Sequence, residues 1–373
     1  MKKIIFCIVL CFAFSISVSA EDLSFNEFIK EQADTYGVNE LEEALPEGAE
    51  EYFKKNAITP DENGWISSLN IGKVLSDLWQ TAKEKAKAPF ATGTLILAII
   101  LLNGVLFTME NGTSSHTAAF AVATASASVI AGPILSVIGS AVKVMQSVSV
   151  FMTAFVPVFA VIVAAGGQAA TSVSMSGLLL GASQAVELVA NHFVIPLMCG
   201  YLSVNIVSAV SPLLAKSSIG ESLKKVSFWV MSLVTTIFLG VLSIQTTVSV
   251  SGDSLTMRTA RFIIGSSVPV AGTVLSEALT TVTASLGILK TSVAIYGVVA
   301  CTVLFLPLLL ELLIWRLVLN ITMAVAGVLS ADGVSKLLRS ADDSLAVLCG
   351  IILLTGALFI ISLTVVVSVG KTV

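Results

Sequence analysis

Apolar residues follow one another in long runs over most of the chain. A helix needs about 20 apolar residues to cross a bilayer, and ten runs of roughly this length can be separated. They cover residues 90–107, 118–140, 148–166, 173–190, 193–210, 226–249, 264–286, 291–313, 315–330 and 345–369. If adjoining runs merge, the number of spans falls to seven. The pattern predicts an all-α fold, a polytopic helical membrane protein.

The residues ahead of these runs show short amphipathic stretches separated by turn residues. Residues 23–37 predict a helix that ends at Gly37, and residues 39–55 predict a helix interrupted at Pro46. Pro60-Asp61-Glu62-Asn63-Gly64 is typical of a loop. Residues 66–87 then predict an amphipathic helix that leads into the first span. We therefore expect a small helical segment over residues 21–88.

The first 20 residues carry the pattern of a secretory signal peptide. Lys2 and Lys3 precede an apolar stretch from Ile4 to Phe14, and Val18-Ser19-Ala20 offers small residues for cleavage after Ala20. The alternative is an uncleaved first membrane anchor, although the apolar stretch is short for a span. With a cleaved signal at residues 1–20, the acidic segment 21–88 is exported.

Composition and charge separate the same two regions. Of the 373 residues, 55% are apolar and 12% are charged, against about 25% charged in a typical soluble domain. Residues 21–88 carry 15 acidic and 7 basic side chains, whereas residues 89–373 carry 9 acidic and 11 basic ones. The low charge content excludes a chain that consists entirely of soluble domains. The net charge of −4 offers no basic surface for nucleic acid, so we expect no nucleic-acid partner.

The apolar region also repeats itself weakly. Val156-Pro157-Val158 recurs 112 residues later as Val268-Pro269-Val270, and Pro196 recurs 111 residues later as Pro307. A charged loop and the closing Val-Ser-Val run recur in the same order. The predicted divisions are first membrane spans at 89–147, a first repeat at 148–250, a linker at 251–265 and a second repeat at 266–373.

Prolines at matching positions of two membrane repeats can mark a site. A proline removes a backbone donor, and inside lipid the freed carbonyl must find a partner in protein or water. Pro157, Pro196, Pro269 and Pro307 are therefore candidate pathway or packing residues at the repeat interface. The alternative is a set of tolerated kinks. Gly166-Gly167-Gln168, which follows Pro157, leaves a re-entrant hairpin open as well.

Four charged residues fall inside the apolar runs, where charge is costly and marks a functional candidate. They are Glu187, Glu277, Glu311 and Arg316. Glu311 and Arg316 flank Trp315 near the end of a run, and we expect them to anchor the chain at the interface. Glu187 and Glu277 are candidate pathway or packing residues, because a proton relay would need partners that the sequence does not offer.

Motifs for catalysis or cofactor binding do not occur in the sequence. There is no phosphate-binding GxxxxGK[ST] loop, no GxSxG and no HExxH. His116 and His192 have no metal-ligand spacing. We therefore expect no enzymatic activity, no catalytic residue, no cofactor and no metal.

Lysines and arginines in short loops predict the orientation of the membrane domain. Loop 211–225 contains three lysines and loop 331–344 contains Lys336 and Arg339. The positive-inside rule places both loops in the cytoplasm. The two repeats would then be parallel, with an even number of crossings each. Arg258 and Arg261 argue against this orientation for the linker 251–265.

Residues 238–272 give the most specific signal in the chain. They contain Phe238-Leu239-Gly240-Val241-Leu242-Ser243-Ile244-Gln245, then Arg258-Thr259-Ala260-Arg261-Phe262-Ile263, then Val268-Pro269-Val270. This stretch resembles the stage III sporulation protein AE family of endospore-forming bacteria. Arg258, Thr259 and Arg261 are its candidate motif residues, and the signal, acidic segment and polytopic domain agree with the family's layout.

The resemblance implies a role that composition does not show. Members of the family are made in the mother cell and lie in the membrane that surrounds the forespore. They belong to an assembly of stage III sporulation A-operon proteins, with an ATPase and ring-forming members, which meets a forespore channel partner. The implied function is a non-enzymatic subunit of this channel, in contact with those proteins and with membrane lipid. A stand-alone secondary transporter with internal repeats is the alternative.

Overall fold

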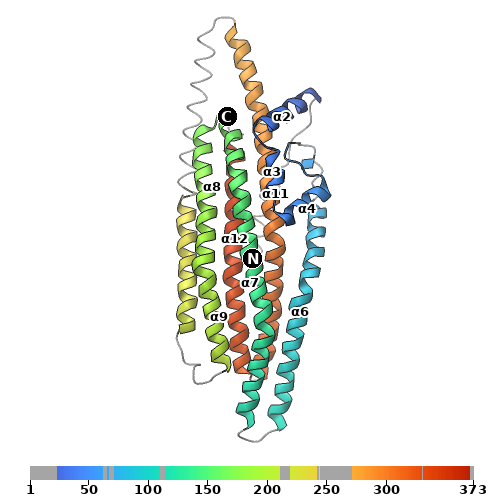
Figure 1. Ribbon diagram of the computed structural model, residues 1–373, viewed down its shortest axis with the longest axis vertical. Helices are drawn as coiled ribbons and strands as arrows, with labels where there is room; N and C mark the ends of the chain where they lie inside the picture. The colour runs from blue at the N-terminus through green and yellow to red at the C-terminus, as the bar shows by residue number, and fades with distance from the viewer. Residues whose placement is uncertain are drawn as a thin grey trace.

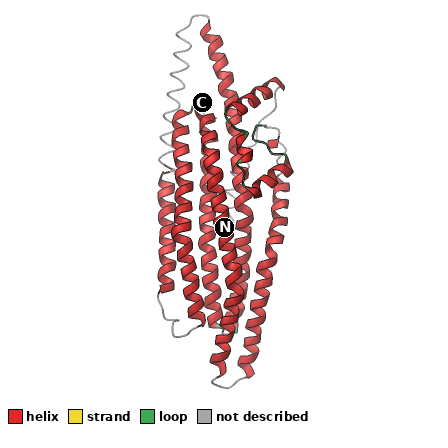
Figure 2. Cartoon of the chain, viewed as in Figure 1, coloured by secondary structure: helices red, strands yellow, loops and turns green. Residues whose placement is uncertain are grey.

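The protein is an elongated bundle of long helices. The computed structural model describes residues 23–61, 65–66, 71–109, 114–210, 219–241, 243, 271–329 and 331–369. Within these ranges every regular element is a helix (Figure 2). Six helical segments there are long and apolar enough to cross a membrane: Trp79–Leu102, Phe120–Ala165, Ala169–Ala209, Ile219–Val241, Thr281–Val328 and Asp332–Thr364. The predicted all-α, multi-span fold is confirmed.

The long helices lie side by side along one axis and run in alternating directions (Figure 1). In chain order they are α6 (Ile71–Met109), α7 (Ser114–Ala165), α8 (Ala169–Val189), the π-helical turn η1 (Ala190–Val194), α9 (Ile195–Val210), a helix at 219–241, α11 (Ala271–Val328) and α12 (Asp332–Val369). Helices α8, η1 and α9 form one continuous rod. The central pair is α11 and α12, which pack along each other.

The described residues hold six candidate spans, where the sequence predicts seven to ten for the whole chain. The runs 118–140 and 148–166 belong to the single 52-residue helix α7. Helix α11 has 58 residues and begins at Ala271. It contains the run 291–313, the run 264–286 from Ala271 onward, and the run 315–330 up to Val328. At about 1.5 Å per residue, α11 is about 87 Å long, far beyond a hydrocarbon core of about 30 Å. Polar residues such as Lys143 and Lys290 interrupt the apolar pattern without ending the helix.

The division at 147/148 falls inside α7 and corresponds to no break in the backbone. The ends of the helices do follow a regular plan. Helix α9 ends and helix 219–241 begins at one end of the bundle. Helix α11 ends and α12 begins at this same end (Figure 1). Two internal repeats, with the boundaries given above, remain a prediction, and the linker 251–265 lies outside the described residues.

A tight turn joins α7 to α8 at the other end of the bundle. Gly166, Gly167 and Gln168 connect the two helices, and Gly167 has φ +85°, a conformation that L side chains rarely adopt. Both flanking apolar segments are long enough for a full crossing. This favours two spans over a re-entrant hairpin. Lys290 of α11 donates a hydrogen bond to Gln168 Oε1 at 3.1 Å, which ties the turn to α11.

The N-terminal segment forms three short helices, α2 (Leu23–Thr35), α3 (Glu40–Glu43) and α4 (Glu47–Asn56). They confirm the sequence prediction, since α2 ends before Gly37, whose φ is +71°, and Pro46 is the residue that precedes α4. From Ile71 onward the predicted amphipathic stretch 66–87 continues without a break into the first span as part of α6. The signal-peptide residues 1–20 lie outside the described residues.

These N-terminal helices pack against the upper part of α11 (Figure 1). The ring of Phe53 meets the ring of Tyr296 edge-on, with centroids 4.7 Å apart, and both side chains are buried. Ser285 donates a hydrogen bond to Gln32 Oε1 at 3.1 Å. Edge-to-face aromatic pairs contribute about 0.5–1.5 kcal/mol beyond their area. The segment is therefore docked on the bundle.

A second contact joins α4 to α6. Lys55 Nζ lies 3.4 Å from Asp77 Oδ1. Tyr52, on the same helix as Lys55, is partly buried, and this burial, with the nearby Asp77 carboxylate, raises the pKa of Tyr52. Both contacts lie at the end of the bundle where α6 begins.

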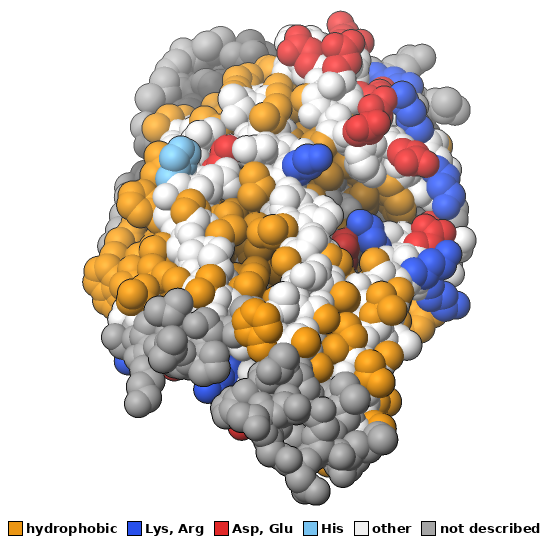
Figure 3. All heavy atoms as spheres, turned by 60° about the horizontal axis from the view of Figure 1, so that its bottom comes forward, with side chains coloured by type: hydrophobic (Ala, Val, Ile, Leu, Met, Phe, Trp, Pro, Cys, Tyr) orange, Lys and Arg blue, Asp and Glu red, His pale blue; other side chains and the backbone are white. Residues whose placement is uncertain are grey.

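Side-chain packing holds the helices close together inside the bundle. A β-carbon added at Gly297 of α11 would lie 2.5 Å from Phe155 Cζ of α7, so only glycine fits there. Small residues permit such close approach in membrane proteins, where packing replaces the hydrophobic effect between helices. Apolar side chains dominate the surface of the bundle, and charged side chains gather toward its upper and right edges in Figure 3. The large apolar side chains that are exposed include Trp229, Val173 and Leu239.

Candidate functional site

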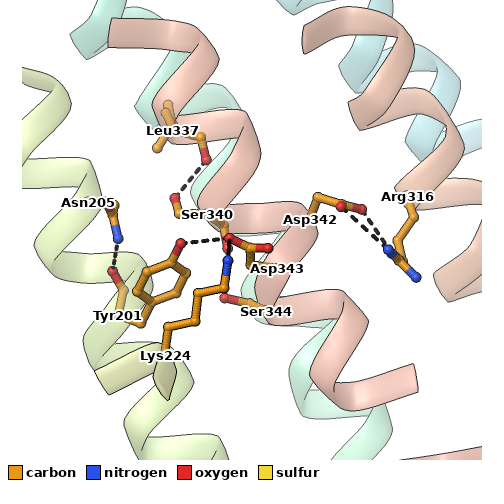
Figure 4. A network of polar contacts seen from close by, with 9 residues as sticks. All are labelled: Tyr201, Asn205, Lys224, Arg316, Leu337, Ser340, Asp342, Asp343 and Ser344. Atoms are coloured by element: carbon orange, nitrogen blue, oxygen red, sulfur yellow. Dashed lines mark hydrogen bonds and ion pairs between the residues drawn. The ribbon is translucent and has the colours of Figure 1, made fainter. Parts of the chain in front are cut away.

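Two adjacent aspartates on α12 organise a polar cluster inside the bundle (Figure 4). Successive residues of an α-helix point about 100° apart, so Asp342 and Asp343 reach different neighbouring helices. They lie about 15 Å along α12 from its start at Asp332, by the rise of about 1.5 Å per residue. We define the Asp342/Asp343 cluster as these two residues with Arg316, Lys224 and Tyr201.

Asp343 connects α12 to two helices of the preceding part of the chain. Its Oδ2 accepts a hydrogen bond from Lys224 Nζ at 2.7 Å and another from Tyr201 Oη at 2.8 Å. Tyr201 belongs to α9 and Lys224 to helix 219–241. The Asp343 side chain is 18% exposed and that of Lys224 is 32% exposed. One carboxylate oxygen thus joins three helices.

Asp342 connects α12 to α11. Arg316 donates from Nε to Asp342 Oδ1 at 2.9 Å and from Nη2 to Asp342 Oδ2 at 3.5 Å. This paired geometry is the one that a planar guanidinium makes best with a carboxylate. The side chains are 34% and 15% exposed. The two aspartates and the two basic residues balance in charge, which lowers the cost of placing them among apolar helices.

The backbone around the aspartates is also satisfied by side chains. Ser340 Oγ donates to the Leu337 carbonyl at 2.7 Å and Ser344 Oγ donates to the Ser340 carbonyl at 2.9 Å, and both serines are fully buried. Asn205 donates to the Tyr201 carbonyl at 2.8 Å. The Asp342/Asp343 cluster therefore links four helices through short contacts. Chemically it can clamp these helices in one arrangement and release them if an ion pair breaks.

Glu311 and Arg316 were expected to act together as an interfacial anchor. The structure pairs each with a different helix instead. Glu311 Oε2 lies 2.9 Å from Lys85 Nζ of α6, and Arg316 pairs with Asp342 of α12. Trp315, which lies between them in the sequence, is 1% exposed and belongs to the core. An anchor exposed at the membrane surface does not fit this burial.

Glu187 and Pro196 lie on either side of an irregular turn. Proline at 196 cannot donate to a preceding carbonyl and clashes with the turn before it. The backbone responds with the π-helical turn η1, in which the Ile195 N–H bonds to the Ala190 carbonyl. Such turns occur frequently at functional sites. Glu187 is half-buried and lines a small cavity with residues of α7 and α12.

The other predicted residues are not brought together by the described structure. Pro157 lies on an exposed position of α7 and Pro307 lies half-buried within α11. Neither lines the cavity at Glu187. Glu277 belongs to α11, but its side chain lies outside the described part. Pro269, Arg258, Thr259 and Arg261 lie outside the described residues altogether, so their roles remain predictions.

Sequence reasoning missed Asp342, Asp343, Lys224 and Tyr201 as site residues. The aspartates and Lys224 fell in the loops predicted at 331–344 and 211–225, where charge needs no explanation. In the structure α12 begins at Asp332, so the aspartates lie on a helix within the bundle. One available signal was that two adjacent acidic residues stand directly before an unbroken apolar run.

The comparison with known protein families bears on this arrangement. Residues 59–370 match the family described as "Stage III sporulation protein AE". The chain belongs to the stage III sporulation protein AE family. The match covers all six candidate spans and the Asp342/Asp343 cluster, and it begins after α4. The resemblance seen in residues 238–272 is thereby confirmed.

A curated member of this family supports the assignment. The "Stage III sporulation protein AE" of Bacillus subtilis (strain 168) is 25% identical over 234 residues, which are 63% of this chain and 59% of the relative. The aligned region thus spans less than two thirds of that relative. No solved structure matches the chain.

Proposed function

We propose that this chain is a non-enzymatic membrane subunit of the sporulation channel that links the mother cell to the forespore. It would lie in the mother-cell membrane around the forespore, with its N-terminal segment exported. The observation that carries this proposal is the family match over residues 59–370 of a chain with six candidate spans. The expected partners are the ATPase and ring-forming proteins of the same operon and the forespore channel partner.

Two features of the structure suit a subunit that meets partners on both sides of a membrane. The docked N-terminal helices provide a folded, acidic surface at one end of the bundle, where Glu42, Glu43 and Glu47 are exposed. The Asp342/Asp343 cluster lies toward the opposite end, where lysines predict the cytoplasm. Helix α11 contacts the N-terminal helices α2 and α4 and also carries Arg316 of the Asp342/Asp343 cluster, so it connects the two ends of the bundle.

Deletion of the gene in the native host tests the proposal. Spore formation should stop after engulfment, while growth in rich medium stays normal, and a copy of the intact gene should restore spores. A growth defect in rich medium, or normal spore yield, would contradict the proposal. Tagged full-length protein from sporulating cells should also co-purify the operon-encoded partners, with an unrelated tagged multi-pass protein as the control.

A stand-alone secondary transporter draws support from Glu187 at a cavity inside the bundle. The two functions differ in what the purified protein does alone. A transporter takes up its substrate into vesicles when an ion gradient is imposed, whereas an isolated channel subunit does not. Ion-dependent uptake by the purified chain would replace the channel proposal.

A further inference from the structure

The cavity at Glu187 is small and partly open, because Glu187 is half-buried while Ser149, Ser183 and Thr355 are buried. It lies between α7, α8 and α12 and has room for about one water molecule. Its polar lining consists of Ser149, Ser183, Glu187 and Thr355, and the rest is apolar. Glu187 lies near the midpoint of the 41-residue apolar segment Ala169–Ala209. A carboxylate at this depth is expensive unless a positive charge accompanies it.

Within the described part of the chain, no positive side chain accompanies Glu187. None of the residues that line the cavity is Lys, Arg or His. Glu187 also makes no ion pair or hydrogen bond with any other described side chain. This contrasts with Glu311 and both aspartates of the Asp342/Asp343 cluster, each of which has a basic partner.

The hydroxyl groups around Glu187 are arranged mainly as acceptors. A hydroxyl has one proton to donate, and two of the three already use it. Ser183 Oγ donates to the Leu180 carbonyl at 3.0 Å, and Thr355 Oγ1 donates to the Ile351 carbonyl at 2.8 Å. Both therefore present lone pairs to their surroundings. Ser149 Oγ accepts from Gln184 at 3.3 Å, and only its own proton is left for the carboxylate.

The next turn adds another acceptor. Asn191 lies in the π-helical turn after Glu187, and its Oδ1 is buried without a hydrogen-bond donor among the described residues. Buried acceptors of this kind are normally satisfied. Asn191 does not itself line the cavity. The hydroxyls that do line it offer more free lone pairs than free protons, which is the lining that a cation requires.

We propose that the Glu187 cavity binds a small monovalent cation, with Glu187 as the charged ligand and the Ser183 and Thr355 hydroxyl oxygens as neutral ligands. One carboxylate neutralises one positive charge, so a divalent ion would leave net charge within the membrane. Space for about one water molecule fits a dehydrated Na⁺. Bound cation would hold α8 and α12 together. The proposal does not depend on the sporulation role, because binding is measured on the purified chain.

Thermal unfolding of the purified full-length protein in detergent tests this site. Ligand that binds only the folded state raises the midpoint in a saturable manner. The pH and the ionic strength are kept fixed while NaCl is substituted stepwise for N-methylglucamine chloride. The unfolding midpoint of the wild type should then rise with a hyperbolic dependence on the Na⁺ concentration. Glu187→Gln should shift the half-saturating Na⁺ concentration at least tenfold upward.

Two further variants make the result specific. Thr355→Val removes one oxygen ligand but keeps the side-chain shape, and it should also weaken the Na⁺ response even if Glu187→Gln does not fold. Glu221→Gln, at an exposed position of helix 219–241, should leave the response unchanged. A wild-type midpoint that ignores Na⁺ would overturn the proposal. A Na⁺ response retained in both cavity variants would overturn it as well.

Discussion

Asp343 and Lys224 are 119 positions apart in the sequence, yet the Lys224 ammonium lies 2.7 Å from the Asp343 carboxylate. The contact fastens helix 219–241 to α12. Helix 219–241 is the least buried of the six candidate spans, with 11% of its apolar window buried, against 61% for α12. The ion pair therefore adds a polar attachment to the apolar contacts that Leu223, Val230 and Phe238 make with the core.

Replacement of Asp343 by Asn should destabilise the bundle. The change leaves Lys224 without its charged partner and weakens the bond from Tyr201. Loss of one partner from a buried pair costs about 3–5 kcal/mol, and partial exposure here reduces that to about 1–3 kcal/mol. Thermal unfolding in detergent measures the loss. The exchanged pair Lys224→Asp with Asp343→Lys should recover part of the stability, whereas Glu51→Gln, at an exposed position of α4, should have no effect. Equal stability of Asp343→Asn and the wild type would show that the pair contributes nothing.

Gly297 should not tolerate a larger side chain. A β-carbon there would lie 2.5 Å from Phe155 Cζ, so Gly297→Ala must displace the buried Phe155 ring or push α7 and α11 apart. Overpacking of this kind costs about 1–3 kcal/mol. Gly287→Ala is the matched control, because a β-carbon at Gly287 on the same helix meets nothing within 4 Å. Unfolding midpoints of the two variants provide the comparison, and an equal effect of both would refute the close contact.

Phe53→Ala should release the N-terminal helices from α11. The Phe53 ring is 2% exposed and packs against Tyr296, and removal of a buried Phe costs about 3–5 kcal/mol. Limited proteolysis should cut residues 23–61 several times faster in the variant than in the wild type. Glu51→Ala, at an exposed position of the same helix, should be cut at the wild-type rate. Unchanged cleavage of Phe53→Ala would mean that other contacts hold the segment.

The orientation of the bundle can be read from cysteine labelling in whole cells. In a background without native cysteines, Lys336→Cys near the start of α12 should be shielded from an impermeant reagent. Glu43→Cys in α3, at the other end of the bundle, should be labelled, since both positions are exposed. Ser217→Cys should behave like Lys336→Cys if the repeats are parallel. Opposite labelling at positions 217 and 336 would instead favour inverted repeats and the transporter function.

The local pattern of residues in the sequence determined the class of the fold and the positions of some helix boundaries. Long apolar runs with few charges can exist only as membrane helices, because lipid offers no hydrogen bonds to an open backbone. Gly37 and Pro46 marked real helix boundaries because their backbone preferences act within one or two residues. The motif residues between 238 and 272 indicated the family, because they form one continuous stretch that can be read from the sequence alone.

Only the tertiary structure decided where the spans end and which charges matter. Lys143 and Lys290 look like boundaries in a hydropathy pattern, yet α7 and α11 pass through them because a helix can extend beyond the bilayer. Asp343 looks like a loop residue until α12 brings it against α9 and helix 219–241. The value of a charge in a membrane depends on what lies within a few ångströms of it, and that neighbour is usually far away in the sequence.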